Sequence, residues 1–386
     1  MMKRGLLVLC LIAPAAWSMD IAWTRMTGQN TVECSPVPIY HKGQVAILAV
    51  NRAGQVMLWN LDGTDLGPGQ DGLVAQLPKG TWSSTPTAGV ADNSALYWFC
   101  SGEGQIVTLD QDFKTRWEYD LGVETRWGTA HPAAVTPTGK TDLCMCWGDS
   151  SGKVTCLDQE GKPVWTTQLE FGGCNAPLQT LPVTQGRSEI LAASGDHLCC
   201  LDSDGRVLWS SNLRGAVSPH PEILELSGRR MMFCGAGAGS LFALTLEGKV
   251  LWEAPIGDEI DSAIELLPRL HESPLILCKG LWGNLHAFDV NGRRVWTHLF
   301  RAKSRSRPLV LDTDGDVNME VLVTAYNQHV YVFDHDGRLL DDVRLSGCIN
   351  GSPMPIYDAS TARTDALVVD SSLLAHRIRF SPPRSP

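Results

Sequence analysis

Short apolar runs recur along the whole chain at nearly constant spacing. Each run has the length and the β-branched content of a strand, and the clearest one has the form Gly-x-Leu-x-x-Leu-Asp. Eight copies, the first and last of them weaker, begin at residues 54, 104, 152, 196, 239, 283, 328 and 371. Their starts are separated by 50, 48, 44, 43, 44, 45 and 43 residues. A period near 45 that runs through the chain is typical of a propeller or a solenoid.

Six of the eight apolar phrases are followed by a hairpin signal, and in five consecutive units a tryptophan follows the phrase. The hairpin signals are the pairs Asp62-Gly63, Glu160-Gly161, Asp204-Gly205, Glu247-Gly248, Asn291-Gly292 and Asp336-Gly337. The tryptophans stand seven residues after the last residue of the phrase, at Trp117, Trp165, Trp209, Trp252 and Trp296. Because their spacing from the hairpin is fixed, we expect these rings to pack between units.

The pattern of each unit predicts four short strands. Another apolar run and a short segment before it, which in most units contains a proline, precede every phrase, and no segment shows a sustained helical period with caps. Eight such units predict an all-β chain, an eight-bladed β-propeller of four-stranded antiparallel blades. The last unit lacks its tryptophan segment, whereas the residues around Trp23 resemble one. We therefore expect the N-terminal strand to complete the C-terminal blade and remove two exposed sheet edges.

The repeat resembles that of the PQQ-like, or quinoprotein-type, eight-bladed propellers. The resemblance rests on the phrase, the acid-Gly turn and the tryptophan, and it covers residues 21–380. That superfamily includes pyrroloquinoline quinone (PQQ) dehydrogenases and the outer-membrane assembly factor BamB. Because members of one fold bind different things, the resemblance implies the fold and leaves the function open.

The first 18 residues read as a secretory signal peptide. Lys3 and Arg4 precede an apolar run of twelve residues, and Ala16 and Ser18 place small residues at positions −3 and −1 of a cleavage site. No stretch approaches the ~20 apolar residues of a membrane-spanning helix. We therefore expect an exported protein, periplasmic or extracellular, with a single propeller over residues 19–380 and a disordered tail over residues 381–386.

Net charge and cysteine content limit the kinds of partner and of covalent cross-link that we expect. The chain of 386 residues has a formal net charge of −10, which becomes −12 without the first 18 residues, and this argues against a nucleic-acid partner. Twelve cysteines in an exported chain would favour disulfides. Most of them fall inside predicted strands, however, so we expect mainly buried free thiols. In the vicinal pair Cys199-Cys200 the two side chains should point to opposite faces of a strand.

One loop has the ligand spacing of a cation site. Carboxylates stand at Asp312, Asp314, Asp316 and Glu320, and Asn318 offers a carbonyl, which suits an oxygen-liganded ion such as Ca²⁺. The loop resembles the calcium loop of FG-GAP repeats, in which glycine normally occupies the position of Val317. A β-branched residue disfavours the positive φ that such loops use. Two interpretations follow: a structural calcium site, on the face of the acid-Gly turns, or an acidic turn without metal.

The opposite face is the candidate ligand face. Loops between the second and third strands, and between successive blades, should carry aromatic and charged residues there. These are Trp82, Arg126, Trp127, Trp147, Asp149, Lys279, Trp282, Lys303, Arg305 and Tyr326. Rings beside cations suit an acidic peptide, an anionic ligand or a glycan. The alternative is that the rings pack against neighbouring loops and the cations are merely solvated. His131, His220 and Arg307 should face the central channel.

Three functions remain from these patterns. We favour a non-enzymatic, monomeric scaffold that binds a protein or glycan partner. A carbohydrate-active enzyme of polysaccharide lyase type, with its site at the channel mouth, is the alternative. A PQQ dehydrogenase fits less well, because those enzymes form the cofactor chamber from large blade insertions and the loops here are short. We therefore expect no bound PQQ.

Overall fold

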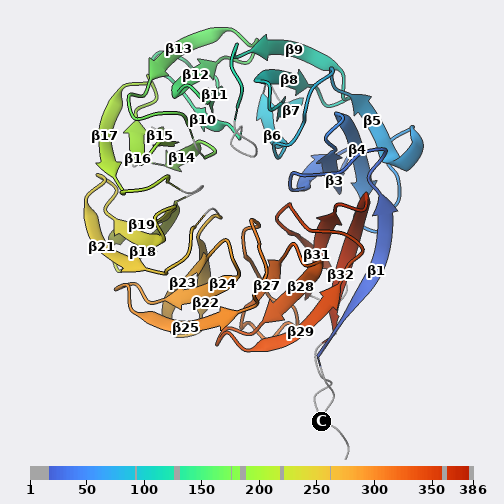
Figure 1. Cartoon of the computed structure of the whole chain (residues 1–386). Helices are drawn as coiled ribbons and strands as arrows, with labels where there is room; N and C mark the ends of the chain where they lie inside the picture. The colour runs from blue at the N-terminus through green and yellow to red at the C-terminus, as the bar shows by residue number, and fades with distance from the viewer. Residues whose placement is uncertain are drawn as a thin grey trace, which may run out of the picture.

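The chain forms a closed ring of eight β-blades (Figure 1). The computed structural model describes residues 17–91, 94–125, 131–174, 176–182, 188–217, 221–260, 262–358 and 363–381. Each blade is a four-stranded antiparallel sheet whose first strand lies innermost and whose fourth lies at the circumference. The predicted fold class is therefore confirmed, and the one helical element described is the short turn η1 (Gln70–Gly72).

The first four blades contain the strands β2 to β17. Blade 1 consists of β2 (Val37–His41), β3 (Gln44–Val50), β4 (Gln55–Asn60) and β5 (Leu73–Gln76). Blade 2 consists of β6 (Thr87–Ala91), β7 (Ser94–Cys100), β8 (Gln105–Leu109) and β9 (Thr115–Asp120). Blade 3 consists of β10 (Ala133–Val135), β11 (Cys144–Gly148), β12 (Lys153–Leu157) and β13 (Pro163–Gln168). Blade 4 consists of β14 (Gln179–Pro182), β15 (Ser188–Ser194), β16 (His197–Leu201) and β17 (Val207–Asn212).

The other four blades contain the remaining strands and return to β1. Blade 5 consists of β18 (Glu222–Leu226), β19 (Arg229–Ala236), β20 (Ser240–Leu244) and β21 (Val250–Pro255). Blade 6 consists of β22 (Glu265–Arg269), β23 (Glu272–Lys279), β24 (Asn284–Phe288) and β25 (Arg294–Leu299). Blade 7 consists of β26 (Leu309–Leu311), β27 (Glu320–Thr324), β28 (His329–Phe333) and β29 (Leu339–Arg344). Blade 8 consists of β30 (Met354–Asp358), β31 (Arg363–Asp370), β32 (Leu374–Ser381) and β1 (Ser18–Met26).

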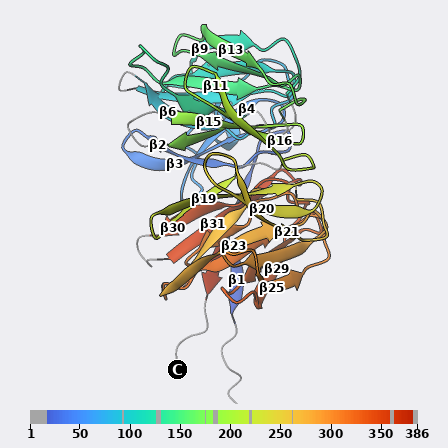
Figure 2. The ribbon, with the colours of Figure 1, turned by 90° about the vertical axis from the view of Figure 1, so that its left-hand side faces the viewer.

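The ring closes as the sequence predicts. β1 pairs antiparallel with β32, with Met26 opposite Leu374 and Ser18 opposite Ser381. The two ends of the propeller thus lie side by side on one blade, as Figures 1 and 2 show. Because β1 begins at Ser18 and β32 ends at Ser381, the propeller extends one residue beyond the predicted limits at each end. Most of the predicted signal peptide and the last five residues lie outside the described part of the chain.

The tryptophans that recur at a fixed position of the repeat pack onto the hairpin turns of the neighbouring blades. The indole Nε1 of Trp252 donates to the carbonyl of Val290, 3.0 Å away, in the hairpin turn of blade 6. A Cβ added to Gly292 of that turn would lie 2.9 Å from the ring, so the ring rests directly on the glycine. Corresponding ring-to-glycine contacts join Trp23 to Gly63, Trp117 to Gly161, Trp165 to Gly205, Trp209 to Gly248 and Trp296 to Gly337. The prediction that these rings pack between units is confirmed.

The junction between blades 1 and 2 is built differently. The hairpin turn of blade 2 has Phe113 in place of glycine, with a positive φ of 61°. The strand that faces it, β5, contains no tryptophan. The Phe113 ring instead stacks on Tyr97 of its own blade, with 5.0 Å between ring centroids, and lies near His41 of blade 1. Tryptophan and glycine are therefore replaced together at this junction.

The cysteines of the described strands are free and mostly buried. Ten of the eleven described cysteines are buried and Cys348 is partly exposed, which confirms the expectation of free thiols. Cys199 belongs to the core between blades 3 and 4, and Cys200 to the core between blades 4 and 5. The vicinal pair therefore points to opposite faces of β16, as predicted. Burial raises the pKa of thiols such as Cys234, to about 12, which makes them poor nucleophiles.

We predict that the ring depends on β1. A chain that lacks residues 19–26 would expose the edge of β32 and lose the Trp23 contact with blade 1. Its melting temperature should fall by much more than the ~2–4 °C that 1 kcal/mol produces in a large domain, or the chain should aggregate. Differential scanning calorimetry beside a chain that begins at Met19 provides the comparison. An unchanged melting temperature would show that blade 8 is stable with three strands.

Candidate functional site

Four of the predicted ligand-face residues have buried side chains. Trp82 and Trp147 are each 1% exposed, and Asp149 and Lys279 are fully buried. The indole of Trp82 donates to the carbonyl of Pro78 across 2.9 Å, and Trp147 belongs to the core between blades 2 and 3. The expectation that these side chains face a ligand therefore does not hold. The aromatic rings pack against neighbouring loops and strands, as the alternative interpretation stated.

The two charged residues of this group have structural roles. Asp149 Oδ1 accepts hydrogen bonds from the backbone N–H groups of Ser151 and Lys153, at 2.8 and 3.1 Å, and so fixes the turn between β11 and β12. Lys279 Nζ donates to the carbonyl of Ser304, 2.5 Å away, and ties the end of β23 to the loop before blade 7. Arg126 and Trp127 lie outside the described residues.

The structure brings the other predicted residues together on one surface. We call Trp282, Arg301, Lys303, Arg305 and Tyr326 the blade 6–7 patch. The ammonium group of Lys303 lies 5.5 Å from the Trp282 ring centroid and 5.8 Å from that of Tyr326, within the range of cation–π contact. Trp282 is 64% exposed, and Arg301 and Arg305 are exposed. An exposed tryptophan in contact with a lysine, next to a loop that also carries two exposed arginines, stands out on a chain of net charge −10.

Backbone hydrogen bonds hold the loops of this patch in place. Ser304 N–H donates to the carbonyl of Leu281 at 3.0 Å, and Tyr326 N–H donates to that of Lys303 at 2.8 Å. Beneath Trp282, the buried carboxylate of Asp258 accepts from the Trp282 N–H at 3.0 Å and from Asn284 Nδ2 at 3.2 Å. The rings and cations are therefore presented on a preorganised surface, which lowers the ordering cost of binding.

Sequence reasoning missed Arg301. It has a positive φ of 50° and lies beside Gly283, whose added Cβ would be 3.0 Å from the Arg301 backbone nitrogen. A loop that carries Arg301, Lys303 and Arg305 at alternate positions was the available signal.

The acidic loop partly fits a cation. Carboxylate oxygens of Asp312, Asp314 and Glu320 lie within 4.8 Å of one another. Asp316 is not part of that group, and its Oδ1 accepts from the Asn318 N–H at 2.8 Å. Val317 adopts a φ of 66°, so the loop has the backbone turn that a β-branched residue disfavours. Burial raises the pKa of Glu320 to about 7 and outweighs two hydrogen bonds from Thr313. The donor set suits Ca²⁺, and calcium binding stays a prediction.

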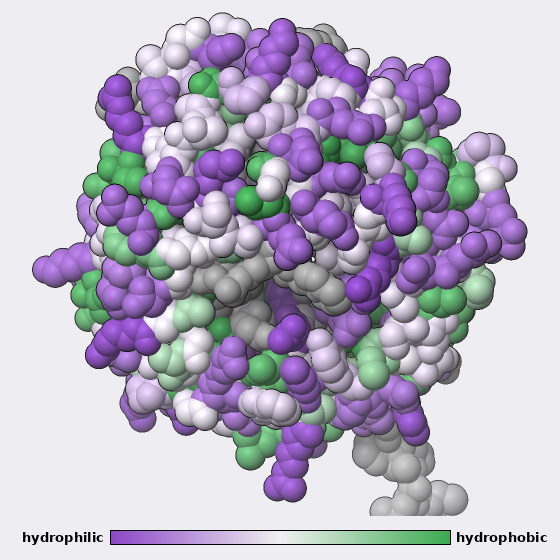
Figure 3. Space-filling model, turned by 45° about the horizontal axis from the view of Figure 1, so that its top comes forward, coloured by the Kyte–Doolittle hydropathy of each residue, from purple (hydrophilic) through white to green (hydrophobic). Residues whose placement is uncertain are grey.

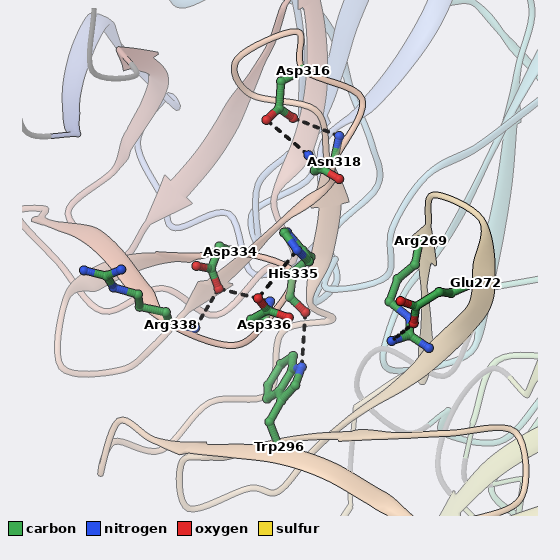
Figure 4. Close-up of polar contacts among 9 residues, drawn as sticks. All are labelled: Arg269, Glu272, Trp296, Asp316, Asn318, Asp334, His335, Asp336 and Arg338. Atoms are coloured by element: carbon green, nitrogen blue, oxygen red, sulfur yellow. Dashed lines mark hydrogen bonds and ion pairs between the residues drawn. The ribbon is translucent and has the colours of Figure 1, made fainter. Parts of the chain in front are cut away.

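The acidic loop lies on the face of the hairpin turns, as predicted. A small cavity of about 120 Å³ lies there between the β22–β23 turn of blade 6 and, in blade 7, the acidic loop and the hairpin turn. Figure 4 shows Asn318 of the acidic loop, His335 and Asp336 of the turn, and the ion pair of Arg269 with Glu272 around it. The Trp296 indole donates to the carbonyl of His335 at 3.2 Å below them.

The central channel contains an ion-pair network from three blades. Figure 3 shows a hollow at the centre of the ring and polar side chains over most of the visible surface. Arg307 places Nε 2.5 Å from Glu265 Oε2 and Nη2 3.5 Å from Glu222 Oε1. Burial raises the pKa of Glu222 to about 7 and outweighs the lowering by the charge of Arg307; the negative charge of Glu265 raises it further. Arg307 thus lies among the innermost strands, as expected, where it pairs with the first strands of blades 5 and 6. His131 Nε2 forms a hydrogen bond with the Thr87 hydroxyl of blade 2. His220 lies outside the described residues.

The fold is an eight-bladed β-propeller, and its repeats resemble those of the PQQ-like class. Residues 103–280 match the family described as "Outer membrane protein assembly factor BamB", which confirms the resemblance seen in the repeats. The matched segment covers blades 3, 4 and 5 and parts of blades 2 and 6.

Solved structures agree with this assignment of the fold. The crystal structure of BamB from Moraxella catarrhalis is similar with a TM-score of 0.67 and 15% identity, over 94% of this chain and 98% of that chain. The structure of BBS1N in complex with ARL6DN, soaked with mercury, gives a TM-score of 0.55 and 8% identity, over 79% of this chain and 93% of that chain. No curated protein matches the sequence significantly. The described residues contain no helix long and apolar enough to cross a membrane.

We predict that chelation destabilises the protein through the acidic loop. A cation that binds only the folded state stabilises it by ~2.7 kcal/mol at a hundredfold excess over its dissociation constant. EDTA should therefore lower the melting temperature, and Asp314→Asn should remove that sensitivity. Asp336→Asn, which changes an exposed aspartate of the same face outside the cluster, is the matched control and should stay sensitive. A melting temperature indifferent to EDTA would identify the loop as an acidic turn.

We also predict a pH effect that depends on Glu222. Its pKa in the folded protein is about 7, whereas an unfolded glutamate titrates near ~4.3. In that window the folded protein holds the proton that the unfolded chain releases, so this group makes stability fall as pH rises from about 4.5 to 7. The melting temperature of wild type, measured against Glu222→Gln across this range, should show that fall. A constant difference between the two proteins would contradict it.

Proposed function

We propose that the protein is an exported scaffold that binds a protein partner through the blade 6–7 patch. The observation that carries the proposal is the exposed Trp282 ring, with Lys303 held between it and Tyr326. Tryptophan, tyrosine and arginine are the residues that dominate binding energy at protein interfaces. The family name, an outer membrane protein assembly factor, also supports a role in protein assembly.

The chemistry of the patch favours an acidic partner segment. Arg301, Lys303 and Arg305 supply three cations within five residues of one loop, against the acidic balance of the chain as a whole. Complementary charge would speed association and select the partner, and the rings would supply apolar contact. An oligosaccharide could use the same rings, and it is therefore an arm of the test.

Photo-crosslinking in the native host tests the proposal. A benzoylphenylalanine at Tyr326 should form an adduct with one acidic protein, and the same group at Tyr357 should not. Tyr357 is the matched control because it is an exposed tyrosine of β30 outside the patch. An adduct from position 357 alone would contradict the proposed surface.

The purified partner then decides the energetic role of the patch. Calorimetric titration should show that Trp282→Ala and Lys303→Ala each weaken binding ~10-fold or more, since a central interface residue is worth ~2 kcal/mol. Lys249→Ala, which removes an exposed cation at a hairpin turn of blade 5, should leave the affinity unchanged. Equal affinities for all three variants would contradict the proposal. Competition by neutral oligosaccharides would point to a glycan site instead.

A further inference from the structure

Asp341 occupies a position that is tryptophan in five other blades. It stands seven residues after Asp334, the end of the repeated phrase of blade 7, as Trp296 stands seven residues after Asp289. The tryptophans at this position rest on the next blade's hairpin turn, and the indoles of Trp117, Trp165, Trp252 and Trp296 donate to a carbonyl there. Asp341 can only accept hydrogen bonds when ionised, so the donor of this position is replaced by an acceptor.

The group that Asp341 contacts is also of the opposite kind: it is a hydrogen-bond donor and not a carbonyl acceptor. In blade 8 the third and fourth strands, β32 and β1, come from opposite ends of the propeller, so no hairpin turn joins them. The backbone nitrogen of Met19 lies 2.8 Å from Asp341 Oδ2 and donates to it. Acceptor and donor have exchanged places at this one junction.

Met19 is held in the core of the propeller by its side chain. Its side chain is 7% exposed and lies in a core cluster with Leu311, Leu345 and Phe380. Ser18, the residue before it, is exposed and is also the −1 position of the predicted cleavage site. Trp17 packs against the same cluster, so the bond that the signal sequence marks joins an exposed serine to a buried methionine within β1.

We propose that cleavage between Ser18 and Met19 creates an α-ammonium group that pairs with Asp341 and locks the ring. In this hydrolysis by a leader peptidase, water adds across the Ser18–Met19 amide. The carboxylate leaves with Ser18, and the freed nitrogen of Met19 takes up protons. With a pKa of about 7.7–8.0, a chain-terminal amine is mostly protonated at neutral pH. The hydrogen bond from Met19 to the Asp341 carboxylate, in which only the acceptor is charged, then becomes an ion pair in which both partners are charged.

The geometry also sets the order of events. Ser18 lies in β1 opposite Ser381, and a protease needs an extended, unpaired substrate. Cleavage must therefore precede the pairing of β1 with β32. Removal of the leader is then the step that supplies the ring with its last charged contact. This inference is independent of the proposed binding function.

Two measurements on the exported full chain test the proposal directly. Intact mass and terminal sequencing of the secreted protein should identify Met19 as the first residue. Reductive methylation at neutral pH should label the α-amine of Met19 several-fold more slowly than the side-chain amine of Lys249. Lys249 is exposed and serves as the solvent-accessible reference. A mature protein that begins at any other residue, or a freely labelled terminal amine, overturns the proposal.

A comparison of two termini separates the ion pair from an ordinary hydrogen bond. One form begins at Met19. In the other form the leader is fused in front of Ala16, so that the mature chain begins with Ala16, Trp17 and Ser18. Asp341→Asn should lower the melting temperature of the Met19 form by several degrees more than that of the extended form. Asp342→Asn, in the same strand but paired with His329, is the control and should lower both equally. An equal effect of Asp341→Asn on both forms overturns the ion pair.

Discussion

The seating of a tryptophan ring on the hairpin glycine of the next blade is the contact on which the ring depends. It needs two residues of complementary kind: a large ring with an N–H donor, and a turn residue without a side chain in the left-handed region. Each alone has little reason for its position, because a solvated turn tolerates other residues and an outer strand does not require tryptophan. Together they repeat the same packing at six of the eight junctions between blades.

The fold could be predicted from the sequence because these contacts are local in pattern. A hairpin such as Asn291-Gly292 and a ring such as Trp252 recur at fixed spacing, and fixed spacing survives even where the rest of the unit has diverged. The closure by β1 was equally accessible, since Trp23 supplied what the last unit lacked. Repetition turned a long-range structural question into a short-range one.

The candidate site was only half accessible, because the register assigns a residue to a face but not to a direction. Trp82 lies in a predicted face loop, yet its ring turns inward onto Gly54, whose added Cβ would be 2.8 Å away. Asp149 could have been assigned correctly, since Asn51 at the same repeat position uses its Oδ1 to fix the equivalent turn. Arg301 joins the patch through a positive φ that no residue pattern announces for an arginine.

The junction of blades 1 and 2 constrains the order in which its residues can be exchanged. With a tryptophan in place, any side chain at the turn glycine meets the ring, as the close approach of 2.9 Å or less at the six standard junctions shows. A phenylalanine such as Phe113 can enter only after the tryptophan opposite has gone. For a chain built from copies of one unit, this makes the substitution path directional: loss of the ring first, then of the glycine. In the reverse order, the new side chain at the turn would clash with the tryptophan ring that is still present. A tryptophan introduced opposite Phe113 would meet the same clash.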